Sequence, residues 1–200
     1  MVELLGENKH AAVILNSCDL YAADVRNPLC NQEITLLASL GITSEELDLR
    51  RFFNTSDQKR QLKQLLGRFG LVWVRGGNSF VLRRAMKASG FDEIICELLE
   101  RDEIVWGGYS AGIVVLTPSL HGIELVDDAH TVPPGYPGAI VWDCLQLLPY
   151  AFAPHYKSDH PESADVDRSV EYFIDNHIPF VALRDGEAMV VNGEASEVIS

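Results

Sequence analysis

The sequence predicts a single α/β domain with a mostly parallel sheet and helices on both of its faces. Short apolar runs alternate with amphipathic segments that end at glycine, which is the pattern of strands and helices taken in turn. The expected strands begin near residues 11, 46, 71 and 103, roughly 25 to 35 residues apart, which is the length of a βα unit. Continuously apolar strands between helices are typical of a parallel sheet buried on both faces. Neither a repeat nor a linker divides residues 1–200.

The first half of the chain contains the regular βα units. Its strands are expected at residues 11–16, 46–49, 71–74 and 103–106. One helix is expected to open at Asn27-Pro28, to place Ile34, Leu37 and Leu40 on a single face, and to end before Gly41. Further helices are expected at residues 56–66, after Asn78 as far as Gly90, and from Phe91 onward.

The second half is less regular. A loop rich in proline and glycine is expected at residues 131–138, and a short strand at 145–148. Residues 162–176 carry apolar side chains at helical spacing and predict a helix. Closing strands are expected at 180–183 and 188–192, with a turn at Asp185-Gly186 between them.

The charge balance excludes two classes of partner. Sixteen Lys and Arg residues against 29 Asp and Glu residues give a net charge of −13, and no block of basic residues is present. Phosphate backbones and anionic lipid headgroups repel such a chain, so we expect neither nucleic acid nor membrane as a partner.

The cysteines and the first residues indicate a cytoplasmic protein. The start of the sequence has neither the basic region nor the apolar region of a signal peptide, and no run approaches the ~18 apolar residues of a membrane span. The four cysteines lie far apart without a CxxC pair, so we expect reduced thiols and no zinc site built from them.

The segment Gly108-Tyr109-Ser110-Ala111-Gly112 matches the G-x-S-x-G pattern of a nucleophile elbow. Such a serine sits on a tight strand-to-helix turn, where a flanking Cβ would clash. The expected strand at 103–106 enters the segment and an apolar run leaves it, which is the setting that the motif requires. The sequence therefore predicts Ser110 as a catalytic nucleophile.

A second glycine turn, Gly76-Gly77-Asn78, follows the strand at 71–74 and opens a helix. Turns of this kind present backbone N–H groups at a helix N-terminus, so the N–H groups of Gly77 and Ala111 would form an oxyanion hole. An ordinary turn with Asn78 as N-cap is equally common, and a phosphate-binding loop is a third interpretation. The segment lacks both GxxxxGK[ST] and GxGxxG, and we expect no cofactor.

A serine nucleophile needs a base, and His155 is the favoured histidine. It follows the strand expected at 145–148, and sites in α/β sheets gather at strand ends. A surface histidine in a polar loop is the alternative. The nearby acidic and histidine side chains resemble a metal cluster without a clear ligand spacing, and no metal is expected. These are Asp159, His160, Glu162 and Asp165.

The third member would be a carboxylate that fixes the imidazole tautomer. Asp185 lies at the turn between two late strands, and Glu187, two residues on, is the alternative acid. The order of α/β-hydrolases, with the acid before the histidine, would instead need Asp127, Asp128 or Asp143. The length of 200 residues is short for that fold.

These residues resemble the serine peptidase family of dipeptidase E (aspartyl dipeptidase) and cyanophycinase. The resemblance rests on residues 74–80 (VRGGNSF), 108–112 (GYSAG), 154–156 (PHY) and 183–186 (LRDG). It implies a class I glutamine-amidotransferase-like, flavodoxin-like fold and a triad of serine, histidine and acid. Ser110 would attack, His155 would relay the proton, and the acid would fall on Asp185, where dipeptidase E carries glutamate.

The resemblance also implies hydrolysis of short peptides through an acyl-enzyme, with dipeptides that begin with aspartate as one substrate class. An acidic first residue needs a cation, for which Arg75 and Arg184 are candidates, and Asn78 completes the candidate substrate-binding residues. Alternative functions are an esterase-like serine hydrolase and a catalytically silent binding protein.

One feature departs from the family. Its members commonly begin with a strand similar to MKLLLTSSG, whereas this sequence starts at residues 2–7 (VELLGE), which resemble the helix that follows. We expect either a missing first strand or a truncated start. A missing strand would expose its neighbour's edge, which a second copy of the chain could cover in a homodimer.

Overall fold

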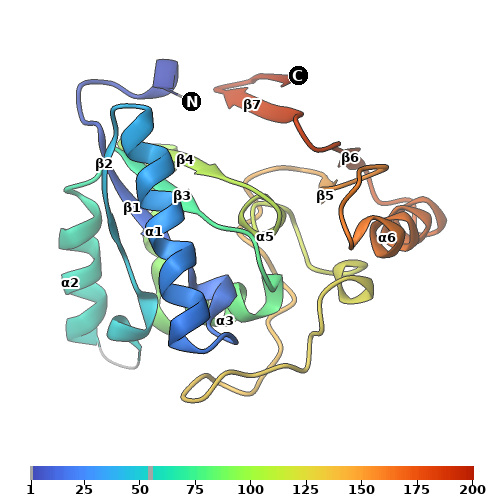
Figure 1. Cartoon of the computed structure of the whole chain (residues 1–200), viewed down its shortest axis with the longest axis horizontal. Coiled ribbons are helices and arrows are strands. Elements are labelled where there is room, and N and C mark those ends of the chain that lie inside the picture. Colours follow the sequence, from blue (N-terminus) through green and yellow to red (C-terminus); the bar gives the residue numbers. More distant parts are fainter. Residues whose placement is uncertain (1, 54–55) are drawn as a thin grey trace.

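A four-stranded parallel sheet with the strand order β2-β1-β3-β4 forms the centre of the molecule (Figure 1). The computed structural model describes residues 2–53 and 56–200. The strands are β1 (His10–Ile14), β2 (Thr43–Glu46), β3 (Leu71–Val74) and β4 (Val105–Gly108). Because the four strands are parallel, their carboxyl ends meet at one edge of the sheet, and the loops that follow them gather there.

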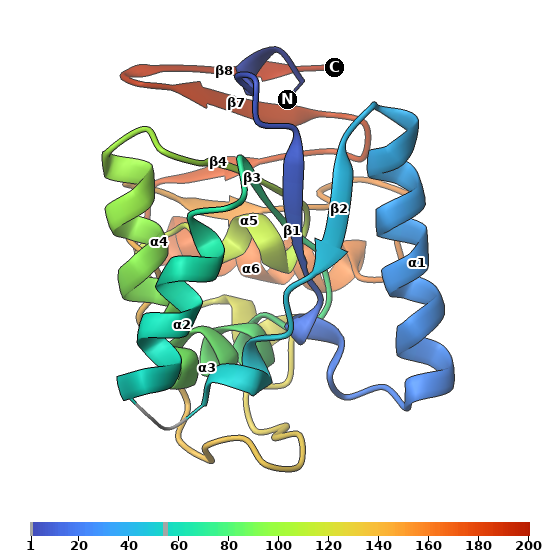
Figure 2. The same cartoon turned by 90° about the vertical axis from the view of Figure 1, so that its left-hand side faces the viewer.

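Helices cover both faces of this sheet (Figure 2). Along β1, Ala11 and Val13 pack with α1 on one face, whereas Ala12 and Ile14 belong to the core on the other. The helices are α1 (Ala23–Ser39) on the first face and α2 (Ser56–Leu66), α3 (Ser79–Ser89) and α4 (Phe91–Glu100) on the second. The strand is continuously apolar because both of its faces are buried.

A second core lies beside β4, between α5, α6 and a small sheet (Figure 1). The helices are α5 (Ala111–Val114) and α6 (Ser163–Asp175). In the small sheet β5 (Ala151–Ala153) pairs in parallel with β6 (Phe180–Ala182). A separate two-stranded sheet is the antiparallel hairpin of β7 (Ala188–Asn192) and β8 (Ala195–Ile199). Short 3₁₀ helices are η1 (Val2–Leu4), η2 (Asn16–Cys18), η3 (Leu49–Phe52) and η4 (Ile123–Leu125).

The α/β class with its mostly parallel sheet is confirmed, and so are most of the elements. The expected strand at 71–74 is β3, and the helices expected at 56–66 and 162–176 are α2 and α6 to within a residue at each end. The loop at 131–138 is also present.

The expected start of the first helix is wrong. Helix α1 begins at Ala23, so Pro28 lies inside it. Arg26, in the first turn of the helix, forms ion pairs with Asp19 and Glu46, each at 2.6 Å, and these pairs stabilise the first turn. The expectation that Leu40 lies on the buried face of this helix is also wrong, since Leu40 is the C-cap residue and is 44% exposed.

Three strand positions are also wrong. The strand expected at 46–49 is β2, three residues earlier, and its polar sequence TSEE suits an edge strand with an alternately exposed face. Strand β4 is two residues later than expected and includes two glycines. Residues 145–148 form no strand; Leu145 and Leu147 instead donate backbone hydrogen bonds to carbonyls at the end of α5, and β5 follows at Ala151.

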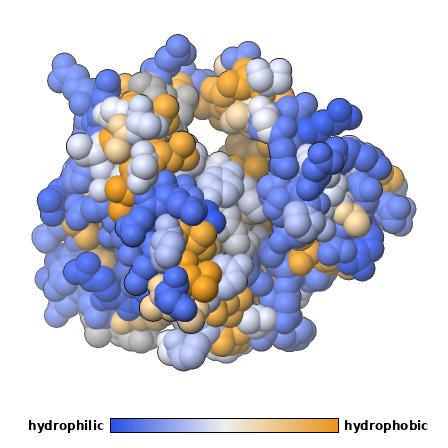
Figure 3. Space-filling model, viewed as in Figure 1, coloured by the Kyte–Doolittle hydropathy of each residue, from blue (hydrophilic) through white to orange (hydrophobic). Residues whose placement is uncertain are grey.

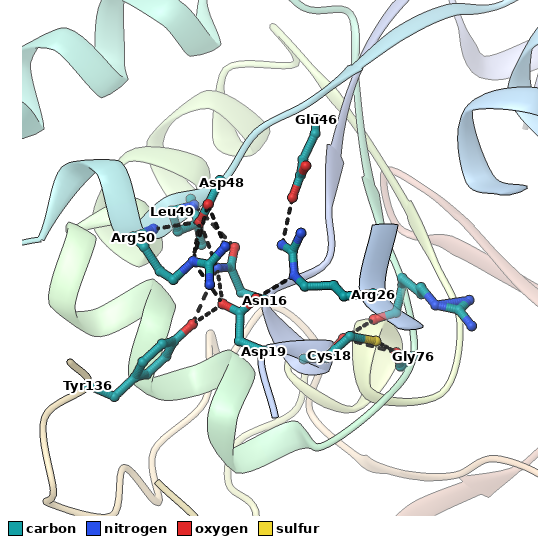
Figure 4. Close-up of polar contacts among 12 residues, drawn as sticks. Asn16, Cys18, Asp19, Arg26, Glu46, Asp48, Leu49, Arg50, Gly76 and Tyr136 are labelled. Carbon is teal, nitrogen blue, oxygen red and sulfur yellow. Dashed lines mark hydrogen bonds and ion pairs between the residues drawn. The ribbon is translucent and has the colours of Figure 1, made fainter. Parts of the chain in front are cut away.

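A buried polar network fastens the loops at the carboxyl ends of β1 and β2 (Figure 4). Asp19, with a fully buried side chain, accepts a hydrogen bond from Asn16 Nδ2 at 2.7 Å and another from the Tyr136 hydroxyl. Arg26 and Arg50 balance its charge from two sides. The network joins three segments that are distant in sequence. It includes the 3₁₀ helix η2, whose Ser17 donates a hydrogen bond to Gly76 O.

The surface in Figure 3 is mainly hydrophilic, with apolar patches near its middle, and it is hollowed between the two halves of the molecule. In the part of the chain that the structure describes, no helix has both the length and the apolar character that crossing a membrane would require.

Candidate active site

Ser110 lies between β4 and α5, at the N-cap position of that short helix. Its backbone has φ 51° and ψ −120°, a region that residues other than glycine rarely adopt. A Cβ on Gly112 would lie 2.2 Å from the Val74 carbonyl oxygen, so only glycine lets the turn approach β3 this closely. A strained strand–turn–helix of this kind holds a serine hydroxyl clear of the backbone.

The glycine turn after β3 lies directly against this serine. A Cβ on Gly76 would be 2.8 Å from Ser110 Cβ. From the other side Ser17 fixes the turn: its hydroxyl donates to Gly76 O at 2.9 Å, and its carbonyl accepts from the Asn78 N–H at 3.1 Å. Within the described residues, the N–H of Gly77 donates no hydrogen bond.

The Ala111 N–H has no hydrogen-bond acceptor either, as far as the described residues extend. Asn78 acts as the N-cap of α3, with its side chain accepting from the Val81 N–H at 2.9 Å and donating to Asp128 O at 3.1 Å. The N-cap interpretation of Asn78 is therefore confirmed. Among the described residues, the N–H groups of Gly77 and Ala111 remain without an acceptor beside Ser110.

His155 and Asp185 meet because they follow neighbouring parallel strands, β5 and β6. Backbone hydrogen bonds continue the pairing past the strand ends, from Leu183 N to Ala153 O and from Tyr156 N to Leu183 O, both at 3.0 Å. His155 Nδ1 lies 2.6 Å from Asp185 Oδ1. This contact leaves the other ring nitrogen of His155 free to act on a second group.

Glu187, the alternative acid, lies elsewhere. Its carboxylate accepts the backbone N–H of Arg184 at 2.8 Å and closes the turn after β6. Asp185 is held in place by its own N–H, which donates to the Ser158 hydroxyl at 2.8 Å.

Ser110 and His155 line one cavity, which lies between α5, α6 and the segment formed by η4 and the two residues after it. No hydrogen bond joins their side chains in the described part of the chain, and catalytic hydrogen bonds are often formed only when substrate is bound. The remaining walls are mostly apolar, with a few polar side chains. The lining residues include Ser79, Ala111, Val114, Asp127, Glu162 and Val166.

Asp127 also lines this cavity, although the sequence reasoning considered it only as an alternative acid for a different fold. It is half-buried in the cavity wall, and burial raises the pKa of its carboxyl to about 6, against the hydrogen bonds from Ser79 that lower it. Glu162 lies close enough to raise that pKa further by its charge. The sequence carries no signal for this placement, because the segment at 117–150 has only one short regular element, the 3₁₀ helix η4, and no hydrophobic pattern fixes its position.

The two candidate arginines differ in their surroundings. Arg75 Nη1 donates to Glu33 Oε1 at 2.7 Å and contacts the Tyr109 hydroxyl. Arg75 is therefore paired on the side of α1 and does not line the cavity. The side chain of Arg184 is exposed and has no partner among the described residues.

One group near the cavity has the composition of a metal site. His155, His160 and Glu162 offer ligand atoms that lie within 4.8 Å of one another, and zinc favours such nitrogen and carboxylate ligands. The two imidazole rings are stacked, with centroids 3.8 Å apart. Stacked rings direct their in-plane lone pairs in parallel, so one ring would have to turn before both could bind one ion.

Comparisons with known proteins agree with one another. The family model described as Peptidase family S51 matches residues 21–199. A probable alpha-aspartyl dipeptidase of Drosophila melanogaster is 30% identical over 141 residues, which cover 68% of this chain and 55% of that protein. Peptidase E of Streptomyces coelicolor is 30% identical over 128 residues, which cover 62% of this chain and 49% of that protein. The chain thus spans about half the length of these relatives.

A solved structure supports the fold. The crystal structure of a putative peptidase E protein from Listeria monocytogenes EGD-e superposes with a TM-score of 0.76, covering 98% of this chain and 87% of that chain. The sequence identity is 22%, so this similarity concerns the architecture alone.

Proposed function

Because this chain belongs to peptidase family S51, we propose that it is a serine peptidase that cleaves short peptides through an acyl-enzyme. The observation that carries the proposal is the shared cavity: Ser110, on a strained turn, faces the same space as His155, whose Nδ1 is 2.6 Å from Asp185. On this proposal the turn is a nucleophile elbow and the three residues form the catalytic triad.

The arrangement supports a complete reaction. Ser110 Oγ attacks the peptide carbonyl while His155 takes its proton, and Asp185 holds the imidazole through Nδ1–H. The N–H groups of Gly77 and Ala111 stabilise the negative oxygen of the tetrahedral intermediate. His155 then gives the proton to the departing amine as the C–N bond breaks. A water molecule, activated by the same histidine, releases the acyl group from the serine.

Asp185 is preferred to Glu187 as the acid because the two carboxylates have different hydrogen-bond partners. Glu187 already satisfies the N–H of Arg184, whereas Asp185 has an oxygen on the imidazole.

Preference for dipeptides that begin with aspartate stays part of the proposal, and Arg184 is its candidate anchor. The name of the Drosophila relative mentions alpha-aspartyl dipeptidase activity. Arg184 precedes Asp185 and its guanidinium is unpaired within the described residues, so it is available to a substrate carboxylate, although it does not itself line the cavity. Arg75 would first have to leave Glu33.

Two further parts of the proposal concern the setting of the enzyme. Four free cysteines favour a reducing compartment, so we place the peptidase in the cytoplasm. A homodimer, and the lack of a nucleic acid partner, stay predictions from the sequence.

The test is hydrolysis of Asp-X dipeptides and of small esters by the wild type and by Ser110→Ala. A serine peptidase cleaves the dipeptides, loses this activity in the variant, and keeps it after dialysis against a metal chelator. Cleavage of esters alone indicates an esterase. Loss of activity on chelation, with recovery on adding Zn²⁺, would instead assign the reaction to His155, His160 and Glu162.

A further inference from the structure

The cavity beside Ser110 has a negatively charged wall. Asp127 and Glu162 both line it, whereas no lysine or arginine is among its lining residues. Among the described residues no cationic side chain forms an ion pair with Asp127. A half-buried carboxylate without a cationic partner costs folding free energy, and such groups gather at functional sites.

Asp127 is also held in a defined position. Its Oδ2 accepts the N–H of Ser79 at 2.8 Å, at the first residue of α3. The same helix start carries the turn with Gly77, whose N–H faces the substrate carbonyl in the proposed mechanism. The carboxylate is therefore tied to the element that positions the reacting group.

The chemistry of a short peptide identifies the group that this carboxylate would meet. In a peptide with a free N-terminus, the ammonium nitrogen is bonded to the carbon next to the first carbonyl carbon. A residue that binds this ammonium must consequently line the cavity of the nucleophile, as Asp127 does. The apolar side chains of Val114 and Val166 in the same cavity exclude water and strengthen such a pair.

We propose that Asp127 binds the free N-terminal ammonium of the substrate and so restricts the enzyme to peptides with an unblocked first residue. Glu162 adds negative potential at the same wall. The net charge of −13 favours the approach of cationic groups as well. This inference rests on the proposed serine peptidase function, and it is independent of which side chain the first residue carries.

The experiment compares two active-site probes that differ only at this ammonium: the diphenyl ester of 1-aminoethylphosphonate and its N-acetyl derivative. Both phosphonylate a reactive serine as one phenol is released, and the second-order rate of labelling is measured by mass spectrometry. We expect the wild type to react faster with the free amine by about 10- to 100-fold, the range of a charge-assisted hydrogen bond. Asp127→Asn should lose this preference, because its reaction with the free-amine probe slows.

The neighbouring Asp128→Asn is the matched control, because this carboxylate is exposed and bonded to Thr131 and the N–H of His130. It should keep the wild-type preference. Circular dichroism checks that Asp127→Asn is folded, and asparagine can still accept the Ser79 N–H.

An unchanged preference in Asp127→Asn would overturn the inference and leave the serine peptidase function in place. The inference would also be overturned, with the serine peptidase function left in place, if a small fluorophosphonate labels Ser110 but neither aminophosphonate reacts. If the fluorophosphonate also fails on folded protein, the proposed function itself is overturned.

Discussion

A Cβ on Gly76 would lie 2.8 Å from Ser110 Cβ, so the loop after β3 and the turn after β4 are in direct contact. The same Cβ would be 3.1 Å from the ring of Tyr109. Two parallel strands that are neighbours in the sheet thus place the proposed nucleophile and the proposed oxyanion donors side by side.

Gly76→Ala is expected to lower kcat/KM by ~100-fold, because a displacement of about 1 Å at the reacting groups has that effect. The measurement is steady-state hydrolysis of a dipeptide, with circular dichroism to show a folded protein. Gly138→Ala is the control, since a Cβ there meets nothing within 4 Å. Equal activity of the two variants would contradict the role of this contact.

Asp185→Asn is expected to lower kcat by about 10²- to 10⁴-fold, because the amide no longer selects the imidazole tautomer that can accept the serine proton. Glu187→Gln should stay within a few-fold of the wild type, since glutamine can still accept the Arg184 N–H. The reverse order of the two effects would make Glu187 the acid of the triad.

Asp127→Asn is expected to stabilise the protein above pH 6. Burial raises the pKa of this carboxyl from 3.8 to about 6, so between these values the folded protein binds more protons than the unfolded chain. The free energy of unfolding of the wild type therefore falls as the pH rises through this window, and asparagine avoids that loss. Urea unfolding should show an advantage on the order of 1–3 kcal/mol for the variant at pH 7.5, and none of this advantage at pH 3.5. A pH-independent difference would show that ionisation of Asp127 has no part in it.

Asp19→Asn is expected to lower the free energy of unfolding by about 3 kcal/mol, because it removes the charged partner of Arg26 from a buried ion pair. Asp57→Asn is the control, since its partner Arg60 and the carboxylate are both exposed, and it should cost at most ~0.5 kcal/mol. Chemical denaturation of both variants measures the difference, and similar small values would show that the network in Figure 4 contributes little.

The elements that could be predicted from sequence are those in which the pattern of apolar residues matches the buried positions. Strand β3 is buried on both faces and α2 has one apolar stripe, so residue pattern alone places them. Strand β2 was expected three residues too late, because its sequence TSEE is polar and only its pairing with β1 makes it a strand. The segment at 145–148 is apolar because it packs against α5, which no local pattern reveals.

The candidate site shows the same division. Ser110 and the glycine turn are visible because their backbone geometry demands particular residues. The strand expected before His155 was misplaced, yet the residue still follows a strand, because β5 lies between the expected strand and the histidine. Asp127 was absent from the predicted site because its position depends on a long loop and on the N-terminus of α3.

Labelling with a fluorophosphonate tests the central claim most directly, because it needs no knowledge of the substrate. The intact mass should rise by one phosphonyl group, and peptide mapping should place it on Ser110. His155→Ala should react far more slowly, and Ser110→Ala should not react. A folded wild type that stays unlabelled, or that carries the group on another serine, would contradict the account.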